Sequence, residues 1–408
     1  MMSLMRDRAI GIYISVPFCR SKCTYCNFAS GVYPAGEHAR YVDRLVEDIA
    51  GARNWAAGMA LDLSRAVDTI YLGGGTPSLL EPELIQRLFE ALRTEFSVDQ
   101  DAEITVECAP GQLPDPVLDA LVAAGVNRVS LGVQSFIDKE AHESGRLHSR
   151  AIVLDDLKRL RAAGITNLNL DLIAGLAGQT FASWDESVSV LLDCGVLHAS
   201  VYMLEVDEES RLGREMLAGG ARYHAGLVPS DDAIAQMYET AIQRLQAAGL
   251  HQYEISNFGR PGYESRHNLR YWQRRPYLGL GLDASSMLVE HDRNEPAGKY
   301  VLRSTTTDDL KAYLAGTTTP ETAWLSPARQ HEEAWFLGLR TNAGVPPAAL
   351  ELEFGPELVR PAAETAARLS ADGLLHSDGS RFRLTPRGRL ISNDVFQEFL
   401  AEPATAQP

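Results

Sequence analysis

The sequence predicts an α/β fold, a partial (β/α)6 barrel of the TIM-barrel type followed by a small C-terminal helical domain. Over the first two-thirds of the chain, six short runs rich in β-branched residues alternate with longer amphipathic segments. That alternation is typical of parallel strands buried on both faces. Three of the amphipathic segments end in Ala-Ala-Gly just before the next run, and glycine there is a common helix stop. Near the C-terminus, helical segments surround one short hairpin pattern.

The predicted elements follow one another in strand–helix order. We expect strands at 11–16, 68–74, 102–108, 127–133, 166–175 and 197–204. We expect helices at 37–57, 81–97, 113–124, 150–163, 181–194 and 231–249. In such a barrel the reactive groups lie at the carboxyl ends of the strands, so we expect the functional side chains there.

The chain after the barrel changes in composition. The segment 210–226 is polar and rich in turn residues, and we expect an irregular excursion over one mouth of the barrel. A hairpin turning on Asp378–Gly379 indicates a winged-helix-like module, here for packing or docking. The predicted units are a barrel (1–250), an aromatic and Gly-rich extension (251–325), a winged-helix-like domain (326–400) and a tail (401–408).

Composition excludes several classes of protein. The formal net charge of −16 repels phosphate backbones, so we expect no nucleic acid as main ligand. No run reaches the roughly 18–20 apolar residues of a transmembrane helix. The N-terminus lacks the apolar core of a secretory signal, so we expect a cytoplasmic protein. Five cysteines are too few and too unevenly spaced for a disulfide framework.

Three of those cysteines lie within eight residues, directly after the first predicted strand. Cys19, Cys23 and Cys26 have the spacing C-x3-C-x2-C. Three thiolates on one loop can hold a [4Fe–4S] cluster and leave one iron open to another ligand. A zinc site is the alternative, but structural zinc usually takes four ligands and no second cysteine or histidine pair follows. Cys108 and Cys194 lie in apolar runs and are expected to be core residues.

The cysteine motif, with Tyr25 just before its third cysteine, resembles that of the radical-SAM superfamily. The resemblance implies that the amine and carboxylate of S-adenosylmethionine (SAM) chelate the open iron of the [4Fe–4S] cluster. It also implies that an electron from the cluster can cleave SAM to a 5′-deoxyadenosyl radical. Tyr13 matches the tyrosine that this family places beside the cluster.

Further matches to the family follow later strands in order. The run YLGGGTPS resembles the glycine motif at the methionyl end of SAM, which assigns Gly73, Gly74, Gly75 and Thr76. Glycines there would let N–H groups face a carboxylate. The polar residues that match SAM-binding positions at the ends of later strands are Glu107, Gln134, Arg146 and Asp171. Such residues could instead cap the next helix.

Within the superfamily the chain resembles the oxygen-independent coproporphyrinogen oxidase group, and in it the haem-chaperone, HemW-like subfamily. Three features distinguish this subfamily from the dehydrogenases. Phe28 stands where the dehydrogenases have a fourth cysteine, and only 18 residues precede Cys19. The run HNLRYW (267–272) matches the motif H-N-x-x-Y-W, which the subfamily associates with haem binding.

The residue types of HNLRYW suit haem. His267 could ligate iron, and Tyr271 and Trp272 could stack on a porphyrin. The alternative is a structural corner with a buried histidine and tryptophan. The next segment departs from the subfamily pattern, because Asp283 replaces a glycine and Ser285 replaces a histidine. These two changes count against the assignment of haem as the ligand and leave the cluster motif intact.

The resemblance implies a haem chaperone that delivers haem to target proteins and receives electrons from a donor. One alternative is an oxygen-independent coproporphyrinogen III dehydrogenase, which decarboxylates its substrate with a 5′-deoxyadenosyl radical. Others are a class C radical-SAM methyltransferase and an interaction protein with a vestigial cluster site. The sequence leaves open whether SAM is cleaved productively, which proteins act as recipient and donor, and the oligomeric state.

Overall fold

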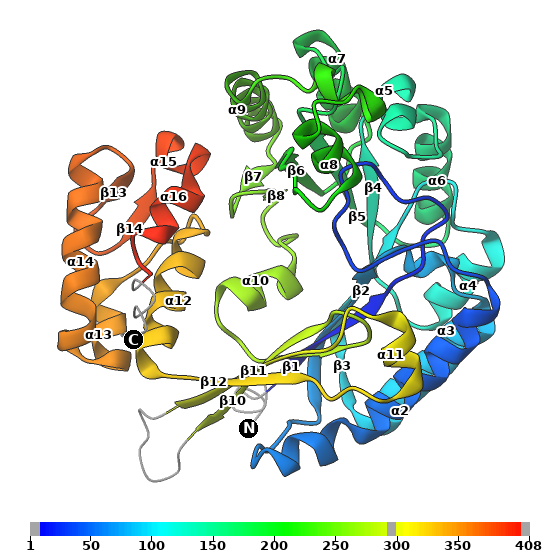
Figure 1. Ribbon diagram of the computed structural model, residues 1–408, viewed down its shortest axis with the longest axis horizontal. Helices are drawn as coiled ribbons and strands as arrows, with labels where there is room; N and C mark the ends of the chain where they lie inside the picture. Colours follow the sequence, from blue (N-terminus) through cyan, green and yellow to red (C-terminus); the bar gives the residue numbers. More distant parts are fainter. Residues whose placement is uncertain (1–8, 292–298, 401–408) are drawn as a thin grey trace.

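The computed structural model describes residues 9–291 and 299–400 and confirms the predicted fold class (Figure 1). The predicted tail 401–408 lies outside the described residues. All six predicted strands are present: β1 Ile10–Val16, β2 Ala66–Gly74, β3 Ser97–Cys108, β4 Arg128–Gln134, β5 Asn167–Ala174 and β6 His198–Met203. So are the six helices: α2 Gly36–Gly58, α3 Pro82–Glu95, α4 Asp115–Ala123, α6 Arg150–Ala162, α7 Phe181–Asp193 and α9 Asp231–Ala247. A short helix, α5 Asp138–Glu143, was not predicted.

The six strands pair in parallel and in chain order at the centre of one sheet. Ile12, Ile14 and Val16 of β1 have no exposed surface, as expected for a strand covered on both faces. The helices that connect the strands lie on the outside of the curved sheet (Figure 1). Gly125, Gly164 and Gly249, the predicted helix stops, all have positive φ, from 83° to 90°.

The segment 251–325 adds strands to both edges of this sheet. At the β6 edge lie β8 Asn257–Gly259 and β7 His251–Gln252. At the other edge β9 Tyr277–Leu280 runs parallel to β1. Three antiparallel strands follow, with a short helix before the last: β10 Ser285–His291, β11 Lys299–Thr305, α11 Leu310–Ala315 and β12 Glu321–Leu325. Between the two edges α10 Arg266–Trp272 occupies the open side of the barrel (Figure 1).

The segment 210–226 is more regular than predicted. It contains the helix α8 Arg211–Leu217. The following segment η2 Arg222–Leu227 is kinked, because Tyr223 and His224 have left-handed φ values of 56° and 57°. The Ser210 hydroxyl accepts a hydrogen bond from the Gly213 N–H at 2.9 Å and caps α8. The Leu212 N–H donates to the Thr24 carbonyl at 2.8 Å. The cap and this contact stabilise a helix where the turn-rich composition indicated none.

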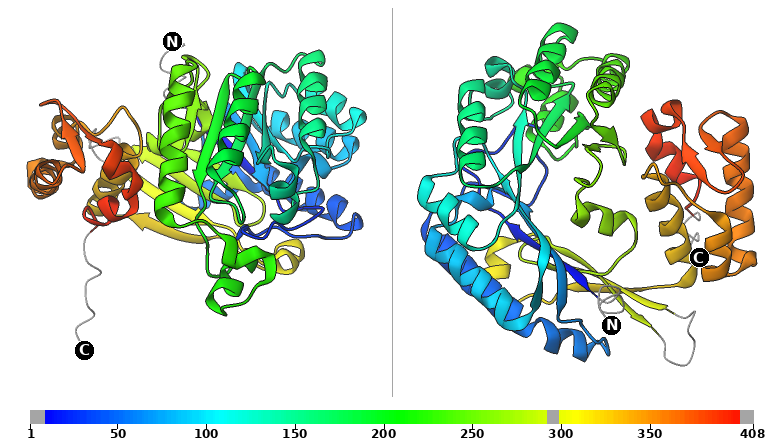
Figure 2. Two further views of the ribbon diagram at one scale, coloured as in Figure 1. Left: turned by 90° about the horizontal axis from the view of Figure 1, so that it is seen from above. Right: turned by 180° about the vertical axis from the view of Figure 1, so that it is seen from behind.

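The C-terminal helices have a hydrophobic core of their own, in which the Trp335 and Phe399 rings stack 4.9 Å apart. The predicted hairpin is confirmed as β13 Leu375–Ser377 and β14 Phe382–Leu384. Figure 2 shows the β10–β12 ribbon reaching from the barrel to these helices. The helices are α12 Pro327–Leu339, α13 Pro347–Phe354, α14 Pro356–Ala371, α15 Pro386–Leu390 and α16 Ser392–Gln397. None of the helices in the described ranges is long and apolar enough to cross a bilayer.

Candidate functional site

The three clustered cysteines lie on a loop that follows β1 and is closed at its base. The Cys19 N–H donates to the Gly31 carbonyl at 2.8 Å, and the Gly31 N–H donates to the Pro17 carbonyl at 2.9 Å. Inside the loop, Lys22 Nζ donates to the carbonyls of Phe28 and Ser30, both at 2.9 Å. These bonds fix the loop between residues 17 and 31, which we name the cluster loop.

Elements far along the chain hold the cluster loop from outside. The Thr24 N–H donates to the Ser144 carbonyl at 3.0 Å. Asn27 Nδ2 donates to Asp207 Oδ2 at 2.9 Å. Arg146 Nη1 lies 3.5 Å from Cys23 Sγ. The loop therefore has a defined position over the carboxyl ends of the strands.

The cysteine side chains face a cavity of about 310 Å³, which we name the cluster cavity. All five cysteines of the chain are free thiols, and burial raises the pKa of the Cys19 thiol. In the described part of the chain, no three histidine, cysteine or acidic side chains converge on a point that could hold a single metal ion. Thiolates that each bind a different iron of a cube stand farther apart than the ligands of one ion. Three thiols that line one cavity are the residue types that hold a [4Fe–4S] cluster.

The glycine motif at the end of β2 packs directly against the cluster loop. A Cβ on Gly75 would lie 2.6 Å from the Phe18 carbonyl oxygen and 2.8 Å from that of Val16. The N–H groups of Gly75 and Thr76 donate to these same two carbonyls at 2.8 and 2.7 Å. They do not face a ligand as expected from the sequence. Close backbone packing against the loop is what requires glycine here.

Two carboxylates face the cluster cavity from β3 and β5. Glu107 Oε1 accepts a hydrogen bond from the Tyr71 hydroxyl at 2.7 Å. Burial raises the pKa of Glu107 to about 7, a shift that the Tyr71 hydrogen bond opposes and the nearby Asp171 reinforces. Burial likewise raises the pKa of Asp171, which accepts hydrogen bonds from Ser130 and Asn169 at 3.1 and 2.7 Å. A ligand that carries positive charge would favour the ionised form of both groups.

Gln134, at the end of β4, gives a direct test of whether the cavity suits a polar ligand. Its backbone has a φ of +68°, which is unusual for a residue other than glycine. Its Oε1 is buried and has no hydrogen-bond partner among the described residues. A buried carbonyl oxygen without a partner is costly. A donor from a bound molecule such as SAM would satisfy it.

Most of the site residues predicted from the sequence share this cavity. The predicted residues among its lining are Cys19, Cys23, Tyr25, Cys26, Gly74, Gly75, Thr76, Glu107, Gln134, Arg146 and Asp171. Tyr13 and Gly73 are outside the lining, and the Tyr13 ring instead stacks on Tyr71 at 6.1 Å. Sequence reasoning missed Ile173 and Tyr202, which line the cavity at the ends of β5 and β6. Their place at strand ends was the only available signal.

The comparisons with known proteins agree with this geometry. Residues 13–191 match the model of the radical SAM superfamily, and residues 325–391 match the model of the HemN C-terminal domain. The heme chaperone HemW of Lactococcus lactis is 32% identical over 98% of this chain and 99% of its own length. The chain belongs to the HemW family. Heme chaperone HemW of Bacillus subtilis is 33% identical over 96% of the chain and 99% of its own length.

A solved structure extends the comparison to the fold. Coproporphyrinogen III oxidase (HemN) from Escherichia coli, described as a radical SAM enzyme, superposes with a TM-score of 0.80 at 23% identity. The match covers 98% of this chain and 93% of that one. It supports the assignment of a radical-SAM partial barrel with a helical C-terminal region.

The HNLRYW motif of this HemW-family chain forms α10 and faces into the barrel. His267 has no exposed surface. Its Nδ1 lies 2.9 Å from the Thr69 hydroxyl, and its Nε2 lies 2.7 Å from the Tyr271 hydroxyl. Burial lowers the pKa of His267 to about 3. In this conformation both ring nitrogens are engaged, and neither is accessible to iron.

Arg270 and Trp272 of the motif also contact other side chains, although the Trp272 Nε1–H has no hydrogen-bond partner among the described residues. Arg270 is fully buried and pairs with Asp68, which also binds Arg275 at 3.0 Å. The Arg340 guanidinium lies over the Trp272 ring, 4.4 Å from its centroid. These contacts match the structural-corner alternative for the motif's packing. The two family departures follow β9: Asp283 is exposed, and the Ser285 and Thr305 hydroxyls lie 3.0 Å apart.

Proposed function

We propose that this HemW-family protein is a haem chaperone that binds a [4Fe–4S] cluster, SAM and haem and transfers haem to target proteins. The observation that carries the proposal is the full-length similarity to proteins named heme chaperone HemW. Phe28, at the position of the dehydrogenases' fourth cysteine, supports the same choice. The recipients and an electron donor are partners that the function requires.

Cys19, Cys23 and Cys26 would hold the cluster, and its open iron would bind SAM. Glu107 and Asp171 would bind the positively charged part of SAM, and Gln134 would accept a hydrogen bond from it. Tyr25 and Arg146 would shield the cluster on the side of Cys23. When bound, the cluster supplies an electron to the sulfonium of SAM. The protein's own contribution is to position SAM and to exclude water.

Haem does not fit on the HNLRYW side chains in the described conformation. His267 has no accessible nitrogen, and the Tyr271 hydroxyl is bonded to His267. Arg340 covers one face of the half-buried Trp272 ring. We therefore assign the motif no axial ligand and no stacking contact. In this conformation the motif holds α10 within the barrel, and we place haem at another surface.

The two catalytic alternatives, the dehydrogenase and the methyltransferase, have less support. Three bacterial relatives that span the chain are named heme chaperone HemW. The likeness to coproporphyrinogen III oxidase, at 23% identity, concerns the fold. Either alternative would require turnover of SAM with a second substrate.

Anaerobic reconstitution followed by haemin titration tests the proposal. We expect brown protein with close to four irons and four sulfides per chain, and a shifted Soret band that saturates at a fixed haemin ratio. Transfer of the bound haem to an apo-haem protein should follow. Vinyl-bearing product from coproporphyrinogen III with SAM and reductant, without a Soret shift from haemin, would contradict the proposal.

A further inference from the structure

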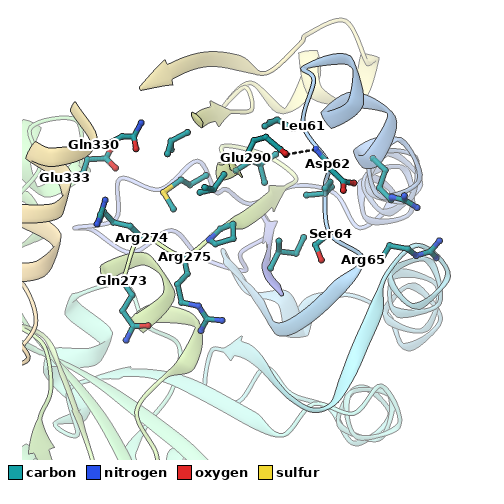
Figure 3. Close-up of a pocket in the computed structure, with 18 of the residues that line it drawn as sticks. Leu61, Asp62, Ser64, Arg65, Gln273, Arg274, Arg275, Glu290, Gln330 and Glu333 are labelled. Carbon is teal, nitrogen blue, oxygen red and sulfur yellow. Dashed lines mark hydrogen bonds between the residues drawn. The ribbon is translucent and has the colours of Figure 1, made fainter. Parts of the chain in front are cut away.

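A second cavity, larger than the cluster cavity, lies at the opposite ends of the strands (Figure 3). Its volume is about 600 Å³, within the usual range for small-molecule sites. It is bounded by the start of β1, the segment before β2, the hairpin β10–β11 and α12. We name it the basal cleft. None of the cluster or SAM residues proposed above lines it.

The basal cleft has an apolar floor. The floor residues are almost entirely covered by their neighbours, with exposed fractions of 2–6%: Ile10, Leu61, Leu63, Met287, Leu288 and Val301. They come from four separate segments of the chain, so the floor exists only in the folded barrel. Together with the half-buried Val289, they give the cleft the apolar surface on which the body of a ligand could pack.

Four arginines surround this floor. Arg274 pairs with Glu353 through two hydrogen bonds, at 2.7 and 3.2 Å, and Arg275 pairs with Asp68 at 3.0 Å. In the described ranges Arg53 and Arg65 have no carboxylate within ion-pair distance, although Arg65 Nη2 donates to the Thr94 carbonyl at 3.1 Å. Figure 3 shows Arg65 and Arg275 at the edge of the cleft, away from Gln330 and Glu333.

Acidic side chains also line the cleft and define its polarity. The Asp62 N–H donates to Glu290 Oε2 at 3.2 Å (Figure 3). Glu333 is paired with Arg303 at 2.7 Å and Glu353 with Arg274. Asp62 and Glu290 therefore oppose an anionic ligand, whereas Arg53 and Arg65 attract one. Substitution of the arginines should therefore weaken the binding of an anionic ligand, and substitution of the acidic residues should strengthen it.

The HNLRYW helix leads directly into the wall of the cleft. Residues 273–276 follow the motif and line the cleft. Arg274 adopts a left-handed φ of +52°, and the Arg275 N–H donates back to the Arg270 carbonyl at 2.9 Å. The buried pair of Arg270 with Asp68 anchors this turn to β2. Changes in the motif would therefore displace the wall of the cleft without touching a ligand there.

We propose that the tetrapyrrole binds in the basal cleft, with its macrocycle on the apolar floor and its propionates toward Arg53 and Arg65. This inference rests on the proposed function, because haem is the ligand that the proposed function requires. Haem combines a flat apolar body with two carboxylates on one edge, and guanidinium groups are suited to carboxylates. HNLRYW is then a positioning segment that shapes one wall of the haem site.

Haemin titration of four variants, followed at the Soret band, tests the cleft. Arg53→Glu/Arg65→Glu should weaken haemin binding about tenfold, and Asp62→Asn should strengthen it about twofold, because partly exposed charges contribute modestly. Arg260→Glu/Arg360→Glu makes the same change in net charge outside the cleft and should have no effect. Arg20→Glu, at the mouth of the cluster cavity, should also have no effect. Protoporphyrin IX dimethyl ester, which lacks free propionates, should bind all variants alike.

The outcomes distinguish a wrong haem site from a wrong proposed function. If the unaltered protein binds no haemin, both the proposed function and the cleft assignment fail. If it binds haemin and Arg20→Glu weakens binding while the cleft variants do not, the cleft assignment fails and the function stands. Melting temperatures within a few degrees of the unaltered protein verify folding. A variant that fails this check is replaced by Ser64→Trp, which fills the cleft and should also weaken binding about tenfold or more.

Discussion

Arg146 places its guanidinium 3.5 Å from the sulfur of Cys23, although the two residues are 123 positions apart in the chain. Arg146 also donates to the Gly132 carbonyl at the end of β4. Burial alone would lower the pKa of Arg146, but the neighbouring Tyr25 and Cys23 more than offset it and the pKa is raised. The arginine therefore remains a cation beside a proposed cluster ligand and ties the cluster loop to the barrel.

Replacement of Arg146 by alanine should weaken retention of the cluster. A hydrogen bond to a charged group contributes about 1.5–3 kcal/mol, which corresponds to at least about a tenfold loss of cluster under a fixed concentration of chelator. Iron and sulfide analysis after reconstitution measures this loss. Arg146→Lys keeps the charge and should give an intermediate result. Equal retention in all three proteins would show that Arg146 has no such role.

Gly75→Ala should displace the cluster loop from β2. The added methyl would lie within 2.8 Å of two carbonyl oxygens, and strain of this kind costs about 1–3 kcal/mol. Denaturant unfolding measures the free energy, and iron content reports the loop. Gly51→Ala is the matched control, because Gly51 lies in α2 with open space around it. It should stabilise the protein by about 0.5–1 kcal/mol. Two variants of equal stability would contradict the prediction.

SAM should stabilise the protein more as the pH rises through about 7. The pKa of Glu107 is raised from 4.5 to about 7, so its contribution to stability is present below pH 4.5 and is lost as the pH rises to about 7. The positive charge of SAM would compensate for the buried carboxylate. The increase in melting temperature with SAM should therefore grow between pH 5 and pH 8. Glu107→Gln should bind SAM more weakly, without this pH dependence.

His267 should make the protein sensitive to acid. Its pKa is lowered from 6.5 to about 3, so its contribution to stability is present above pH 6.5 and is lost as the pH falls toward 3. Below pH 6.5 the unfolding free energy of the His267→Gln variant should therefore fall less steeply with pH. The difference in slope should correspond to about one proton taken up on unfolding. Urea unfolding at several pH values measures the slope. His376→Gln, at an exposed position of β13, is the control. A slope unchanged by His267→Gln would exclude a buried neutral imidazole.

The strands and helices of the barrel could be predicted because their signals are local. Each strand is a continuous apolar run, and glycines at positions such as Gly125 and Gly164 end the helices between strands. The α8 helix could not be predicted in this way. Its stability depends on the Ser210 cap and on the Leu212 contact with Thr24, which lies 188 positions earlier.

Residue spacing alone identifies the cysteine loop, the order of the site residues along the strand ends and the family. Each follows from spacing along the chain, because successive parallel strands place their carboxyl ends at one edge. Only the tertiary structure decided which residues are accessible. HNLRYW has the composition of a haem site, but Thr69 and Asp68 of β2 bind His267 and Arg270 and keep them buried. The basal cleft likewise forms only where four separate segments come together, and no local sequence pattern predicts that contact.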